Sequence, residues 1–85
     1  MSGKELEYIK EVFEQNWIAP IGPHLTKFED IIKEYAGAKH AIAVTSGTAG
    51  IHLGLKALGV GEGDYVICSS LTFIGTVNPF IYCGA

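Results

Sequence analysis

The tripeptide Ser46-Gly47-Thr48 consists of residue types that suit the binding of a phosphate ester. A glycine lets a phosphate approach the backbone, and the two hydroxyl groups can donate hydrogen bonds. The tripeptide also precedes a segment with helical periodicity, and the first N–H groups of a helix have no partner within it. The alternative is that Ser46 or Thr48 only caps this helix, as serine and threonine often do. The tripeptide alone leaves both interpretations open.

Thr72 and Phe73 form a second pair of candidate ligand-binding residues. Phe73 could stack on a flat heteroaromatic ring, and Thr72 offers a hydroxyl group beside it. A phenylalanine that follows a strand is more often a core residue, so the binding role depends on its pairing with the tripeptide at 46–48. Together the two segments could hold the phosphate and the ring of one ligand.

The remaining candidates for chemistry indicate neither catalysis nor metal binding. His24 and His40 fit surface positions, and His52 fits a packing position in a helix. Cys68 and Cys83 form neither a CxxC pair nor a cluster with histidine, so no zinc or redox site is predicted. We expect both thiols to be reduced and buried.

The charge of the chain indicates which classes of partner it is expected to bind. Lysine and arginine together number 6, all of them lysine, against 9 aspartates and glutamates, which gives a net charge of −3. Nucleic-acid binding requires clustered basic residues, so it is not expected. No apolar run approaches the length of a membrane span, and the start of the chain does not look like a signal peptide. A cytoplasmic protein without membrane contact is therefore expected.

The elements that must position these residues follow from hydrophobic periodicity. Apolar residues recur at helical spacing in residues 4–15 and 23–36, and Gly37 suits a left-handed helix end. Residues 41–44 and 65–68 are continuous apolar runs, typical of strands that are covered on both faces. Helical stretches follow each of them, over residues 49–58 and up to about Tyr82, with Pro79 expected either to kink the last helix or to restart it after Asn78.

The predicted order is helix, helix, strand, helix, strand, helix, which is an α/β arrangement with two parallel strands. A β-α-β unit has a right-handed crossover, and ligands bind outside the carboxyl ends of its strands. The loops at 45–48 and 69–73 are thus expected to share one rim. The loop at 16–23 contains two prolines and a glycine but also Trp17, Ile18 and Ile21, so we expect it to pack on other residues.

The sequence resembles the pyridoxal-phosphate-dependent sugar aminotransferases of the DegT/StrS type over nearly its whole length. The residues that carry the resemblance are Phe28-Glu29, Tyr35, the run Ala43-Val44-Thr45-Ser46-Gly47-Thr48-Ala49-Gly50-Ile51-His52-Leu53, Gly63-Asp64-Tyr65-Val66-Ile67 and Leu71-Thr72-Phe73. The leading segment, with Asn16-Trp17-Ile18-Ala19-Pro20 and Gly22-Pro23, is similar in particular to members that aminate nucleotide-linked 4-keto-6-deoxy sugars.

This resemblance implies the amino-terminal part of the large domain of a fold-type I aminotransferase, with pyridoxal 5′-phosphate as cofactor. Ser46, Gly47, Thr48, Thr72 and Phe73 would then bind the cofactor, with the phosphate at the tripeptide and the pyridine ring against Phe73. The segment Asn16, Trp17, Ile18 and Ala19 would approach a keto-sugar nucleotide substrate. A homodimer and an amino-acid donor, usually glutamate, are further implications. Gly50, Gly54 and Gly75 depart from the commonest family pattern, which has alanine at Gly50 and Gly54; each loosens a helix by up to ~1 kcal/mol relative to alanine.

The same resemblance implies that the chain lacks the catalytic residues. The aspartate that pairs with the pyridine nitrogen and the lysine that forms the Schiff base lie farther along in the family, and none of the lysines here matches that position. We therefore expect a fragment, with a helical segment at 1–37 and a β-α-β-α unit at 38–85 that carries the phosphate loop. Two alternatives remain open: a sugar dehydratase of the same fold and cofactor, and a non-catalytic phosphate-binding or regulatory module. We expect the 85 residues not to fold stably alone.

Overall fold

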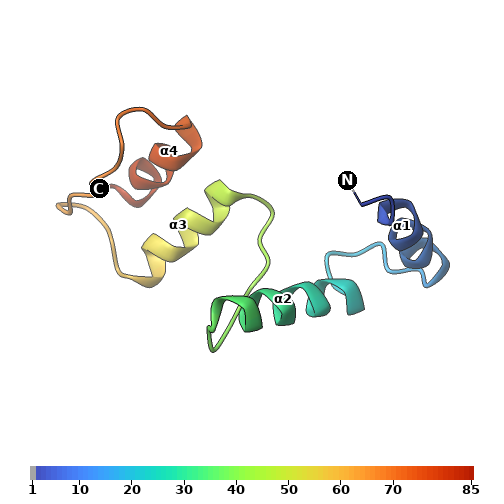
Figure 1. The fold of residues 1–85 in the computed structure, drawn as a ribbon. Coiled ribbons are helices and arrows are strands. Elements are labelled where there is room, and N and C mark those ends of the chain that lie inside the picture. Colours follow the sequence, from blue (N-terminus) through green and yellow to red (C-terminus); the bar gives the residue numbers. More distant parts are fainter. Residues whose placement is uncertain (1) are drawn as a thin grey trace. The chain divides into compact units, whose positions relative to one another are not determined.

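The computed structural model describes residues 2–85 and contains four helices (Figure 1). These are α1 (Glu5–Glu14), α2 (Pro23–Ala36), α3 (Gly47–Ala57) and α4 (Ile74–Cys83). The chain divides into two units, one up to Ala43 with α1 and α2, the other from Val44 to Ala85 with α3 and α4. All four helices coincide with the predicted helical segments to within about two residues, apart from the start of α4, for which no bound was predicted.

Helix α1 ends because Asn16 adopts a left-handed backbone conformation, with φ of 60°. The N–H of Asn16 donates to the carbonyl of Phe13 at 3.1 Å, and the N–H of Trp17 donates to the carbonyl of Val12 at 3.0 Å. These two bonds form a Schellman motif, in which asparagine takes the position that glycine usually occupies. Asn16 is therefore a structural residue of the helix end, whatever else its side chain does.

The loop between α1 and α2 only partly meets the prediction that it packs on other residues, because residues 16–21 are all exposed, Ile18 at 71% and Ile21 at 67%. The Trp17 indole lies against Gly22, where an added Cβ would be 3.3 Å from the ring. His24, in the first turn of α2, contacts two side chains of α1. Its Nε2 lies 3.4 Å from a carboxylate oxygen of Glu11, and its ring centroid is 5.7 Å from that of Tyr8.

Helix α2 begins and ends as predicted from its sequence. Pro23 occupies the first turn, where its missing N–H is not needed, and Gly37 takes the left-handed conformation with φ of 63°. After the helix, the N–H of Ala43 donates to the Glu29 carboxylate at 2.9 Å. This hydrogen bond fastens the following extended segment to α2.

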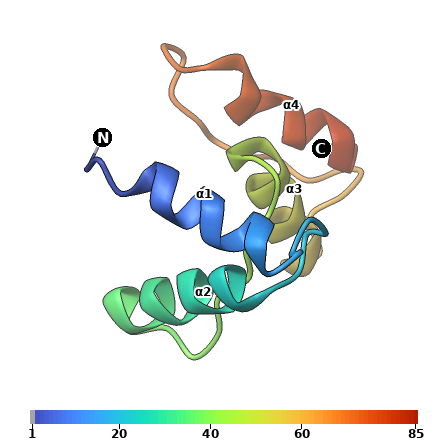
Figure 2. The same ribbon diagram turned by 90° about the vertical axis from the view of Figure 1, so that its right-hand side faces the viewer.

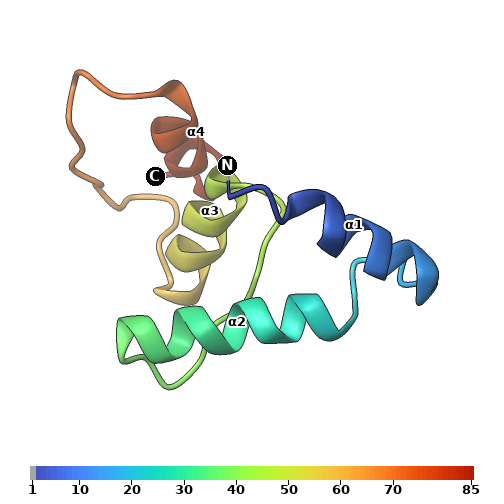
Figure 3. The ribbon, with the colours of Figure 1, turned by 45° about the vertical axis from the view of Figure 1, so that its right-hand side comes forward.

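Helices α3 and α4 pack against each other, and views from two directions show them side by side (Figures 2 and 3). The buried residues of α4 are Gly75, Pro79 and Cys83, which recur every four positions and so share one face. The His52 ring of α3 meets the Tyr82 ring of α4 edge to face, with centroids 5.5 Å apart. Pro79 lies inside the continuous helix, so of the two predicted alternatives, a kink or a restart after Asn78, the restart is wrong.

The two predicted strands are not formed within residues 2–85. Residues 41–44 and 65–68 have no regular secondary structure, and Ile42 and Ile67 are 74% and 97% exposed. A strand exists only when a neighbouring chain segment completes its hydrogen bonds, and these two segments do not pair with each other. The predicted parallel pair is therefore absent, and the described part of the chain is helical.

The prediction that both thiols are buried is correct for Cys83 and wrong for Cys68, which is exposed. Cys68 belongs to the second unpaired segment, so it lacks the sheet that would have covered it. No helix among residues 2–85 has both the length and the apolar character needed to cross a membrane.

Candidate functional site

The first part of the candidate site is the turn into α3. Ser46 has extended backbone angles, and its hydroxyl oxygen accepts a hydrogen bond from the Ala49 N–H at 3.1 Å. The Ser46 carbonyl accepts the first backbone bond of the helix, from Gly50 at 3.0 Å. Ser46 is therefore the N-cap of α3, as the simpler of the two sequence interpretations proposed.

Capping by Ser46 still leaves donors free at the start of α3. The hydrogen bonds found within residues 2–85 provide no partner for the backbone N–H groups of Gly47 and Thr48. Both groups belong to the first turn, where the helix dipole favours a negative charge. The turn can therefore offer two backbone donors and the Thr48 hydroxyl to an anion such as a phosphate ester.

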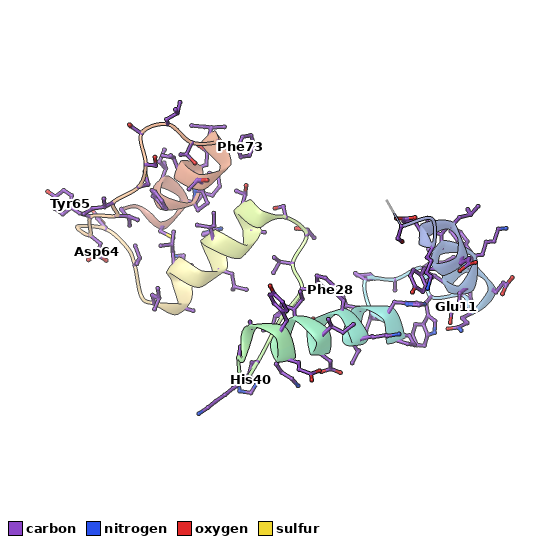
Figure 4. The ribbon with its side chains drawn as sticks, viewed as in Figure 1. Glu11, Phe28, His40, Asp64, Tyr65 and Phe73 are labelled. Atoms are coloured by element: carbon purple, nitrogen blue, oxygen red, sulfur yellow. The ribbon has the colours of Figure 1, made fainter. Side chains whose placement is uncertain are left out.

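The structure brings Thr48 and Phe73 together, although 25 positions separate them in the sequence. Gly75, in the first turn of α4, lies between their side chains. A Cβ added to Gly75 would be 2.6 Å from the Thr48 hydroxyl oxygen and 2.5 Å from Cε1 of the Phe73 ring. The ring is 76% exposed and projects from the start of α4 (Figure 4). A hydroxyl group and an accessible aromatic face are thus neighbours at the helix ends.

This arrangement can accept a ligand with a phosphate and a flat ring. The free N–H groups and the Thr48 hydroxyl suit the phosphate, and the exposed ring of Phe73 suits stacking on a heteroaromatic system. The Phe73 ring and the Thr48 hydroxyl take up the space that a side chain at position 75 would need. These features fit pyridoxal 5′-phosphate, which carries both groups.

The structure gives less direct support for a binding role of Thr72 and of the loop at 16–19. Thr72 is exposed, and its hydroxyl makes no hydrogen bond among residues 2–85. The segment at 16–19 belongs to the first unit, where Trp17 lines a hollow of about 680 Å³ together with residues of α2 that include Thr26 and Lys27. Ile18, the next residue after Trp17, is exposed.

That Gly75 lies against Thr48 and Phe73 was not predicted from the sequence, in which it stood out only as a departure from the family pattern. The signal was present as a glycine two positions after Phe73, but its meaning depends on Thr48, which is distant in sequence. Elsewhere, the buried Nε2 of His52 has no hydrogen-bond partner within residues 2–85. No group of three or more potential metal ligands gathers in this part of the chain.

Replacing Ser46 with alanine should destabilise α3 without removing the free donors of Gly47 and Thr48. The lost cap is worth about 1 kcal/mol, so we expect a lower melting temperature for the full-length protein. Its affinity for a phosphate ester should change only a little, because those donors remain. Ser46→Asp is the matched control, because aspartate also caps helices, yet its charge opposes a bound phosphate. Ser46→Asp should keep the melting temperature and weaken phosphate binding. Equal affinities for the two variants would contradict an anion site here.

Comparison with known proteins gives a consistent result across the whole chain. The profile of the DegT/DnrJ/EryC1/StrS aminotransferase family matches residues 1–85. EpsN of Bacillus subtilis, whose name describes a pyridoxal phosphate-dependent aminotransferase, is 55% identical over 96% of this chain and 21% of its own length. GDP-perosamine synthase of Caulobacter vibrioides is 44% identical over 100% of this chain and 23% of its own length. The spore coat polysaccharide biosynthesis protein SpsC of Bacillus subtilis is 45% identical over 96% and 21%. The chain thus spans about a fifth of the length of these relatives.

Proposed function

The chain belongs to the DegT/DnrJ/EryC1/StrS aminotransferase family, and from this membership we propose that it forms the cofactor-anchoring part of a pyridoxal-phosphate-dependent sugar aminotransferase. The proposed reaction moves an amino group from glutamate to a keto-sugar nucleotide. The main observation in support of the proposal is that Thr48 and Phe73 lie close together, beside the free N–H groups at the start of α3. A homodimeric, cytoplasmic parent protein belongs to the same proposal.

Within this proposal, the residues of the chain bind and orient rather than react. The N–H groups of Gly47 and Thr48 and the Thr48 hydroxyl would hold the phosphate, and Phe73 would stack on the pyridine ring. Thr72 would supply a further hydroxyl group. Pyridoxal phosphate, when bound, supplies the electron sink and the temporary carrier of the amino group. The catalytic lysine and aspartate would come from the parent protein outside these residues.

The proposal is tested with the full-length parent protein loaded with pyridoxal phosphate. Addition of glutamate should shift the cofactor absorbance toward that of pyridoxamine phosphate, and a keto-sugar nucleotide should reverse the shift. Glutamine and aspartate serve as comparison donors. Absence of a shift with every amino donor would refute transamination, and release of water from the sugar nucleotide would instead identify a dehydratase.

The segment Asn16 to Ala19 is proposed to contact the sugar nucleotide, as GDP-perosamine synthase, a relative, is named for a nucleotide-linked sugar. Since Asn16 also closes α1 in a left-handed conformation, the two roles must be separated. Asn16→Gly keeps that conformation and removes only the side chain. We expect an unchanged melting temperature and a rise of about fivefold in the KM for the sugar nucleotide, the effect of one lost hydrogen bond.

Asn16→Val is the control for the structural role of Asn16. A β-branched residue is strained in this conformation by about 1–2 kcal/mol, so this variant should melt at a lower temperature. If Asn16→Gly leaves KM as it was, Asn16 serves only to end the helix, and the substrate contact must be sought at Trp17 or Ile18.

A further inference from the structure

Gly22 joins the loop after α1 to helix α2, and its backbone conformation is one that favours glycine. Its φ is 157° and its ψ is 174°, and a residue with a side chain is strained in this conformation. The Gly22 carbonyl accepts the N–H of Thr26 at 3.2 Å, a hydrogen bond of the first turn of α2. Gly22 therefore fixes the direction in which the loop enters the helix.

The Trp17 indole packs on this turn from the other end of the loop. A Cβ added to Gly22 would lie 3.3 Å from Cδ2 of the indole and 3.4 Å from Cε3 and Cγ, so the attached side of the ring rests against the glycine backbone. The Trp17 N–H donates to the Val12 carbonyl at 3.0 Å, and the Ile21 N–H donates to the Ala19 carbonyl at 2.7 Å. The loop is thus held at both ends and between them.

The loop at 16–22 has a defined backbone although it is apolar and mostly exposed. Ile18 and Ile21 are 71% and 67% exposed, and Asn16 at the start of the loop is left-handed. Uncommon backbone conformations persist where the surrounding structure determines them, and they gather at binding sites. The conformations of Asn16 and Gly22 therefore point to a loop that is shaped to present its side chains to a ligand.

We propose that Gly22 is a positioning residue for the sugar-nucleotide substrate: its turn supplies the surface on which the Trp17 indole rests, and this contact holds residues 16–19 in the arrangement that binds the substrate. Gly22 acts through Trp17 and does not itself touch the substrate. A side chain at position 22 changes the φ of the turn, so the backbone under the indole moves and the loop moves with it. This inference rests on the proposed function, because it presupposes that residues 16–19 contact the sugar nucleotide.

The test compares Gly22→Ala with Gly37→Ala in the full-length parent protein loaded with pyridoxal phosphate. Gly37 also has a positive φ, of 63°, but an added Cβ there has nothing within 4 Å. Both variants should melt at a lower temperature than the wild type, because alanine is strained at either position. Only Gly22→Ala should raise the KM for the sugar nucleotide, by roughly tenfold, the scale of a misplaced binding group. The half-reaction with glutamate should keep the wild-type rate in both, because the loop is not proposed to bind glutamate.

The fluorescence of Trp17 gives a readout that requires neither substrate nor cofactor. In the full-length apoprotein, the difference between the spectra of a protein and of its Trp17→Phe counterpart isolates the emission of Trp17. Gly22→Ala should shift this emission to longer wavelength, because the indole leaves the glycine backbone and meets more water, whereas Gly37→Ala should not. Gly22→Ala and Trp17→Ala should also raise KM less than additively, since both break the same contact.

The outcomes distinguish this inference from the proposed function. A wild-type protein whose pyridoxamine form reacts with no keto-sugar nucleotide overturns the proposed function and this inference with it. Normal wild-type activity combined with an unchanged KM in Gly22→Ala overturns the inference alone. Equal losses in the two half-reactions also overturn it, because Gly22 would then serve only the fold. If Gly22→Ala does not fold, Trp17→Ala decides: an unchanged KM overturns the inference, and a higher KM with a normal glutamate half-reaction supports it.

Discussion

Phe73→Ala in the full-length parent protein is expected to weaken the binding of pyridoxal phosphate by roughly tenfold to a hundredfold, because stacking of an aromatic side chain on a heteroaromatic ring contributes about 1–3 kcal/mol. The ring is 76% exposed within its unit, so little apolar surface depends on it for folding there. The melting temperature of the apoprotein should therefore change much less than the affinity does. Absorbance titration and thermal unfolding of the same preparations provide the two measurements.

Phe73→Tyr is the matched control for this prediction, because it keeps a flat ring of nearly the same size. Its affinity should stay close to that of the wild type, whereas Phe73→Leu, which is apolar but not flat, should resemble Phe73→Ala. The competing ligands are pyridoxal, which lacks the phosphate, and simple phosphate esters, which lack the ring. If Phe73→Ala retains its affinity for phosphate esters and the wild type shows no preference for pyridoxal phosphate among them, the chain is a phosphate-binding module rather than part of an aminotransferase.

The isolated 85-residue chain is expected to show no cooperative thermal transition as a monomer. Within residues 2–85, burial is confined to Gly75, Pro79 and Cys83 of α4, and many large apolar side chains are exposed. Figure 4 shows one of them, Tyr65, projecting from the segment between α3 and α4. A core of this size cannot offset the conformational entropy of 85 residues.

The measurement is circular dichroism with temperature, in the far ultraviolet for helix content and in the near ultraviolet for fixed aromatic packing. Four helices of 10–14 residues are marginal in water without tertiary contacts, so helix content should decline gradually on heating. The full-length parent protein should unfold in a sharp transition under the same conditions. A sharp transition of the isolated chain at a concentration where it is monomeric would show that its two units stabilise themselves.

The helices were predictable because their signals are local. In α2, the proline at the first turn and Gly37 at the end lie within the segment that they delimit, and the apolar stripe has the helical period. The capping role of Ser46 follows from its own side chain and an N–H three positions away. Interactions of this range can be read from consecutive residues.

The strands were not predictable in the same way, because pairing depends on segments that are distant in sequence. The apolar runs at 41–44 and 65–68 have the composition of buried strands, yet within residues 2–85 they meet no partner. The left-handed Asn16 was also missed, since asparagine signals a helix end less clearly than glycine does. Composition therefore predicts that a segment is suited to a sheet. It does not predict that a sheet is present.

The amino-acid sequence by itself determined the four helical segments, both ends of α2 and the family, because each depends on residue types at fixed local spacing. Only the tertiary structure decided that Thr48 and Phe73 are neighbours and that Gly75 is the residue between them. The packing of α3 against α4 produces that arrangement, and no spacing in the sequence encodes it. The physical reason is the difference in range: a helix cap spans three or four residues, whereas a binding site gathers side chains from separate segments through space.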